Sequence, residues 1–152
     1  SDNTIGFGDL SSSSVRYATG DALGSSSQTE AFNMTVTTNA PYGYILTVEG
    51  DTLKKGVDEI TEIGGSNTTP PVGTNAFGIR LVATGGSGTV TAPYDGSGFA
   101  YNATVSPVEI ARATTGDDVT TTYSVRAAAT IAPTLHPGSY ATSLTYVATA
   151  TF

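Results

Sequence analysis

Few side chains in this sequence could do catalytic chemistry. The chain has one histidine, His136, and no cysteine. Nucleophilic catalysis by serine, and general-base catalysis near neutral pH, usually recruit a histidine. Pro137 and Gly138 follow His136, and both residue types favour a turn, so we interpret His136 as a turn residue. No particular pair of carboxylates is marked out for glycoside hydrolysis. We therefore expect a protein that is not an enzyme.

Aspartates in or beside glycine-rich loops raise the alternative of a calcium site, because calcium prefers oxygen ligands. There are five of them: Asp21, Asp51, Asp95, Asp117 and Asp118. No D-x-D-x-D-G loop is present, and aspartate is also an ordinary turn former. We expect no resident cofactor and keep calcium as the alternative.

Two other surface features could bind or carry sugars. Three N-x-S/T triplets fit the N-glycosylation pattern, although such triplets arise easily by chance in so threonine-rich a chain. Their acceptors would be Asn33, Asn67 and Asn102. Aromatic faces can stack on sugar rings, but most of the eight tyrosines fall on the inward phase of a strand. Tyr42 and Tyr94 are the two that we expect to be exposed.

The charge balance limits the kinds of binding partner and the cellular location that we expect. The net charge is −7 with only six lysines and arginines, which argues against a nucleic-acid partner, because phosphate binding needs a basic surface. Only 12% of residues are charged, about half the usual share.

No apolar run is long enough to span a membrane. The Ser/Thr-rich composition is typical of exported proteins. We expect an extracellular, cell-surface protein whose first residue, Ser1, follows removal of a signal peptide; a chain trimmed for study would begin in the same way.

The elements that would position these side chains are β-strands. Apolar residues alternate with polar ones in six segments, a period typical of half-buried strands: 31–40, 41–50, 75–84, 98–107, 122–132 and 139–152. Turn-rich stretches lie between them, including GGSNTTPPVG at 64–73. The pattern predicts an all-β fold, an Ig-like or jelly-roll β-sandwich of two antiparallel sheets with about 7–10 strands.

The two ends of the chain raise one question: what packs against the N-terminal segment and what covers the last strand. We predict an N-terminal extension over 1–14 and a single domain over 15–152. Within the extension, residues 4–10 resemble an unusual strand, because Ile5 and Phe7 alternate with glycines, and glycine in a strand often marks close approach of another backbone. The last strand runs to Phe152 with no polar tail, so its final side chain needs cover.

Two placements of the N-terminal strand answer that question. It could pack on its own domain, or it could complete the sheet of a neighbouring copy by β-augmentation and so build an open filament. In the second case the donor strand is 4–10, with Ile5, Phe7 and Leu10 as anchors. The acceptor groove would include Leu144, Tyr146 and Phe152, and donation would cover the otherwise adhesive edge. On physical grounds alone the two placements have nearly equal weight.

Several segments resemble known secreted proteins. TNAPYGYILTVEGDTL, GTNAFGIRL and YSVRAAATIAPTLHPGSYATSLTYVATATF are similar to small secreted β-sandwich surface proteins of candidate-phyla-radiation bacteria. More distantly, PGSY…TYVATATF looks like the last strand of spore-coat-U and chaperone–usher pilins and of WxL modules, and the whole arrangement is similar to TasA-like fibres. The Trp of WxL modules and the pilin disulfide are both absent.

The resemblance implies an extracellular fibre and no catalytic residues. Together with the two chain ends it favours a pilus-like or biofilm matrix filament, a homopolymer assembled head to tail by strand donation. The alternative is a monomeric cell-surface adhesin or carbohydrate-binding module, with matrix glycans as partners and exposed Tyr42 and Tyr94 as its contacts.

Overall fold

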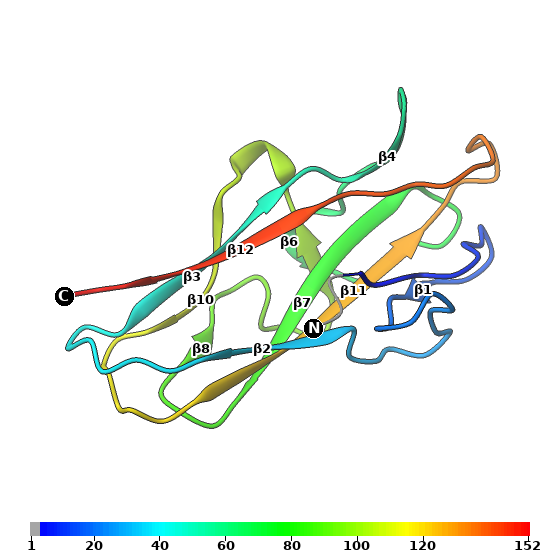
Figure 1. Ribbon diagram of the computed structural model, residues 1–152. Coiled ribbons are helices and arrows are strands. Elements are labelled where there is room, and N and C mark those ends of the chain that lie inside the picture. The colour runs from blue at the N-terminus through cyan, green and yellow to red at the C-terminus, as the bar shows by residue number, and fades with distance from the viewer. Residues whose placement is uncertain (1–3) are drawn as a thin grey trace.

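The computed structural model describes residues 4–152, which form an all-β sandwich with one short 3₁₀ helix (Figure 1). The strands are β1 (Arg16–Tyr17), β2 (Phe32–Val36), β3 (Tyr44–Gly50), β4 (Leu53–Lys55), β5 (Asp58–Ile60), β6 (Gly64–Thr68), β7 (Ala76–Thr84), β8 (Thr89–Val90), β9 (Phe99–Tyr101), β10 (Val108–Ala113), β11 (Thr121–Thr130) and β12 (Leu144–Ala150). The 3₁₀ helix η1 spans Ala103–Val105. The predicted fold class is confirmed.

The first sheet is built around β11. Its strands follow the order β1-β11-β7-β9-β6, and β2 also pairs with β11. The β7–β11 ladder is antiparallel and runs from Thr84 opposite Thr122 to Ala76 opposite Thr130. The other edge of β11 is divided, because β2 covers residues 121–125 and β1 covers 128–129.

The second sheet has the order β12-β3-β10-β8. β12 pairs with β3 along its whole length, from Leu144 opposite Gly50 to Ala150 opposite Tyr44. Among the described residues β12 has no strand on its other side, so it is an edge strand (Figure 1). The hairpin β4–β5 forms a separate two-stranded unit.

The core lies between the sheets and is built from the alternating residues. Ile79 and Leu81 of β7 and Val125 of β11 are buried, as their period predicts. At the centre, the hydroxyls of Tyr44 and Tyr123 lie 2.7 Å apart in a hydrogen bond between the two sheets. This bond satisfies two polar groups that would otherwise be buried at a cost.

Buried tyrosines should make the fold sensitive to alkali. Burial raises the pKa of Tyr101 from its ordinary 10.0 to about 12, and burial and the Tyr44 bond raise the pKa of Tyr123. The unfolded chain then loses protons first as pH rises, so stability is intact below pH 10 and falls above it. We expect a loss of about 1.4 kcal/mol per pH unit for each such tyrosine. Urea denaturation between about pH 8 and 11.5 measures this; midpoints that do not fall above pH 10 would contradict it.

Several segments differ from the sequence-based expectation. Residues 139–143, for example, were expected to begin the last strand, but β12 starts only at Leu144. Residues 103–105 were expected to extend a strand but form η1, because the Asn102 side chain caps the turn by accepting from the Thr104 backbone N–H. The glycine-rich stretch at 64–73 was expected to be all turn, but its first part is β6, paired irregularly with β9 at the edge of the sheet.

The N-terminal segment 4–10 packs on its own domain. Gly6 and Thr19 exchange two backbone hydrogen bonds of 3.0 Å, and the Phe7 ring meets Phe77 edge to face at 6.3 Å. A Cβ on Gly6 would lie 2.8 Å from the Ala22 Cα, and one on Gly8 would collide with the Leu23 carbonyl oxygen. The close backbone approach that the glycines indicated therefore occurs within the chain, against residues 19–24.

Candidate functional site

An apolar groove of about 1190 Å³ lies between β12 and the N-terminal segment. Its floor belongs to the first sheet, with Phe77 and Ile79 of β7 and Val125 and Ala127 of β11. Its walls are residues 4–10 and Phe32 on one side, and Leu53, Ile131 and residues 135–146 on the other. These wall residues include side chains that pack on the core but remain only partly buried: Ile5, Phe7, Leu10, Phe32, Ile131, Leu135, Tyr140, Leu144 and Tyr146.

The groove exists because the sandwich is closed over only part of its length. The edge strands β2 and β12 approach each other where the Phe32 and Tyr146 rings meet at 5.6 Å. β2 covers β11 only as far as Val125, and beyond that point no strand bridges from β11 toward β12 among the described residues. The apolar floor between the sheets is thus left open.

The free edge of β12 borders this groove. Leu144 and Tyr146 line it, and their strand makes ladder bonds only toward β3 in the described chain. Burial raises the pKa of the Tyr146 hydroxyl, which keeps it neutral up to strongly alkaline pH. The site therefore combines unpaired backbone groups with an apolar floor, the combination that accepts an added strand.

The predicted donor and acceptor residues fall into two groups. Ile5, Phe7 and Leu10 line the groove from one side, and Leu144 and Tyr146 from the other. Phe152 does not line it. It is 85% exposed beyond the end of β12, so the cover that its position seemed to require is absent in the described chain.

The sequence did not reveal the groove rim. Residues 131–143 follow β11 as an irregular segment that hairpin β4–β5 fixes in place. Lys54 and Ala141 exchange two backbone hydrogen bonds, the Lys55 Nζ donates to the Pro137 carbonyl at 2.6 Å, and His136 Nδ1 lies 2.9 Å from an Asp58 carboxylate oxygen. His136 is exposed and lies just after the turn at residues 133–134, and it ties the rim to the hairpin.

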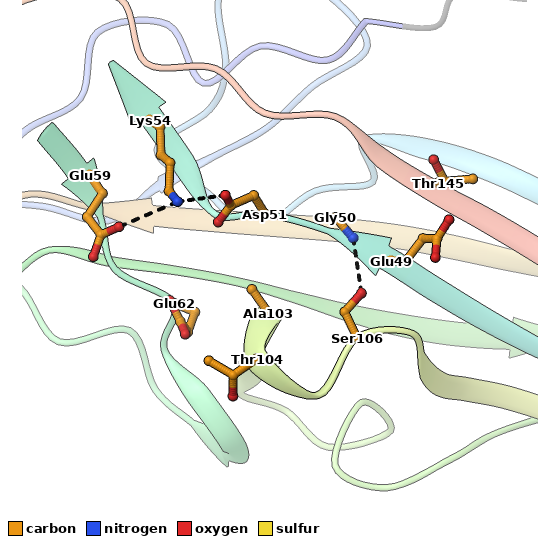
Figure 2. A pocket seen from close by; sticks show the side chains of 10 residues that line it. All are labelled: Glu49, Gly50, Asp51, Lys54, Glu59, Glu62, Ala103, Thr104, Ser106 and Thr145. Carbon is orange, nitrogen blue, oxygen red and sulfur yellow. Dashed lines mark hydrogen bonds and ion pairs between the residues drawn. The ribbon is translucent and has the colours of Figure 1, made fainter. Parts of the chain in front are cut away.

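A second, polar concavity of about 670 Å³ lies beside hairpin β4–β5 and η1 (Figure 2). It is lined by four carboxylates, Glu49, Asp51, Glu59 and Glu62. The Lys54 ammonium donates to Asp51 at 2.6 Å and lies 3.9 Å from Glu59. That hydrogen bond lowers the pKa of Asp51. Within residues 4–152 no three acidic or histidine side chains are grouped so as to hold a metal ion.

Two of the remaining loop aspartates, Asp21 and Asp117, serve local turns. Asp21 accepts hydrogen bonds from the Thr19 hydroxyl and the Leu23 backbone N–H, which lowers the pKa of its carboxyl. Asp117 accepts from the Val119 backbone N–H. These bonds are those of ordinary Asx turns.

The sugar-related residues have different environments. Asn33 is exposed on β2. The Asn67 amide is part of the fold, because it donates to the Pro93 carbonyl and accepts from the Gly98 N–H, and Asn102 caps η1. Tyr42 is 64% exposed as expected, but Tyr94 is 2% exposed. The expectation that Tyr94 is exposed was wrong, because its loop folds back and its carbonyl accepts from the Leu81 N–H.

The fold is an all-β sandwich in which the edge strand β12 borders an open apolar groove. No protein-family model matches this chain, and the comparisons with curated proteins and with solved structures gave no match either. No helix among residues 4–152 is long and apolar enough to cross a bilayer.

Proposed function

We propose that this chain is the structural subunit of an extracellular filament, assembled head to tail by β-strand donation. The observation that carries the proposal is the free edge of β12 beside an open apolar groove. A donated strand would pair with the unpaired backbone of β12, and its alternate side chains would enter the groove. Donation from each copy to the next is a heterologous contact and gives an open polymer.

The donor is residues 4–10 of another copy. Seven extended residues span about 23 Å, which matches the seven residues of β12. Ile5 and Phe7 share one face of the segment, so both would enter the groove. Leu10 is out of this phase and would contact the end of the groove.

The donor must first leave its own domain. Its only strand-like pairing in the described chain is the Gly6–Thr19 bridge, supplemented by the Phe7–Phe77 contact and by the Arg16 Nε bond to the Phe7 carbonyl. The side chains of Ile5, Phe7 and Leu10 also pack on the core. A single two-bond bridge with this packing should still hold the segment less firmly than the long ladders hold the strands of the sandwich. The segment could therefore be exchanged between copies while the rest of the domain stays folded.

The monomeric adhesin or carbohydrate-binding module is less well supported. It rested on two exposed tyrosines, and Tyr94 is buried. Tyr42 alone does not make a stacking platform.

Deletion of residues 1–10 is the direct test. We expect the full chain to form long uniform filaments by electron microscopy at neutral pH. The truncated chain should keep its β-sheet circular dichroism but give only discrete particles, because the donor is gone while the β7–β11 and β3–β12 ladders remain.

A second variant separates side-chain anchoring from chain length. Ile5→Ser with Phe7→Ser keeps the backbone donor but removes both apolar anchors, and it should also fail to polymerise. Val57→Ser is the matched control, since Val57 is fully exposed at the β4–β5 turn. Filaments from the truncated chain would refute donation by residues 4–10.

A further inference from the structure

The outer face of the β7–β11 ladder holds every buried side-chain polar atom that lacks a hydrogen-bond partner within residues 4–152. These atoms are Arg80 Nε, Ser124 Oγ, Arg126 Nε and Thr130 Oγ1. Residues 124, 126 and 130 share one face of β11, opposite to Val125 and Ala127, which point into the core. Native structures leave few such groups unpaired, and an absent ion or water is a common reason.

Two of these groups are like charges placed side by side. Arg80 and Arg126 are direct cross-strand partners, so their Cβ atoms are about 5 Å apart on the same face. Burial, and then the charge of Arg126, lower the pKa of Arg80. Like charges in this position are unfavourable.

No carboxylate in the described chain offsets this pair. Arg80 Nη1 makes one long bond, 3.4 Å, to the Ser97 carbonyl. By contrast, Lys54, Lys55 and Arg112 each have an acidic partner. Arg16 also lacks an acidic partner, but its guanidinium donates to the carbonyls of Phe7 and Leu23. The adjacent charges of Arg80 and Arg126 have no such compensation, so a counter-ion from outside the chain would relieve their repulsion.

We propose that Arg80 and Arg126 bind a single phosphate or sulfate group on the outer face of β7 and β11. Guanidinium groups match the oxygens of such anions in a bidentate geometry, and two of them balance a double negative charge. The strongly negative chain as a whole would repel an extended polyanion, so the ligand is an isolated group rather than a nucleic acid.

The test is thermal unfolding and calorimetric titration of the full chain with inorganic phosphate and sulfate. Anion that binds only the folded state raises the melting temperature. We expect a dissociation constant on the order of 1 mM and no comparable rise with chloride at matched ionic strength, which controls for screening. Arg80→Gln and Arg126→Gln should each weaken binding about tenfold or more.

The controls keep the test independent of folding. Arg112→Gln removes an exposed arginine that is already paired with Glu109, and it should bind the anion as the parent chain does. Without anion, Arg126→Gln should be at least as stable as the parent, because it relieves repulsion. Stabilisation no greater than with chloride, or an undiminished response in Arg126→Gln, would overturn the proposal. Glucose 6-sulfate distinguishes a sulfate ester from free sulfate as the natural ligand. Binding tighter than that of inorganic sulfate indicates an ester, and equal binding indicates the free ion. Both results support the site.

Discussion

Replacing Tyr123 by alanine is expected to destabilise the fold by about 4–5 kcal/mol. The side chain is fully buried, and removing a large aromatic ring from a core leaves a cavity that costs about 3–5 kcal/mol. The substitution also leaves the Tyr44 hydroxyl without its partner, which adds a desolvation cost. Because domains are stable by about 5–15 kcal/mol, this loss removes a third or more of the total and should lower the melting temperature clearly. Urea denaturation of both chains gives the difference.

A double-mutant cycle separates the hydroxyl from the ring. Tyr123→Phe keeps the ring and should cost about 1–3 kcal/mol, because it leaves the buried Tyr44 hydroxyl without a hydrogen-bond partner. Tyr44→Phe should behave in the same way. The double variant should cost less than the sum of the two, since replacing both partners leaves no polar group unpaired. Strict additivity would show that the two hydroxyls do not depend on each other.

Gly8→Ala is expected to release the N-terminal segment from its own domain. Gly8 has a φ of +62°, and its Cβ would collide with the Leu23 carbonyl oxygen. The amides of Gly6 and Thr19, which bond each other's carbonyls, should then exchange hydrogen at least about tenfold faster. Because donation requires the segment to leave, filaments should also form sooner than from the parent chain.

Gly56→Ala is the matched control for this experiment. Gly56 also has a φ of +62°, but a Cβ there would meet nothing within 4 Å. The Gly56→Ala variant therefore introduces the backbone strain of a positive φ without a steric clash. Unchanged exchange at Gly6 and Thr19 in Gly8→Ala would contradict the described packing. Faster exchange combined with slower assembly would show that the intramolecular contact does not compete with donation.

The sequence predicts the parts of the fold that depend on local alternation. The runs around Phe77 and Val125 were recognisable because every second residue is apolar and those residues became the core. The shorter segments SVRYAT, TLKKGVDEITEI and GTVTAP are also candidate strands by their sequence, and they contain β1, β4, β5 and β8. The close backbone approach at Gly6 and Gly8 was foreseeable, since only glycine fits there.

The rest depends on partners distant in sequence. β6 is a strand only because β9 lies beside it, and its Gly-Ser-Asn composition gives no local signal. Tyr94 is buried because its loop is held by Asn67, whose amide bonds Pro93 and Gly98. The groove could be predicted only in part: Leu144 and Tyr146 follow from alternation, whereas Leu135 lines it through the hairpin that fixes the rim.

The pairing of β12 has a mechanical consequence. The strand is hydrogen-bonded to β3 over all of its seven residues, and antiparallel ladder bonds lie perpendicular to the strand axis. A pull on Phe152 along that axis would load the whole ladder in shear, so its bonds would share the force instead of opening one after another. The C-terminal end of the chain is thus fixed in a way suited to bearing tension.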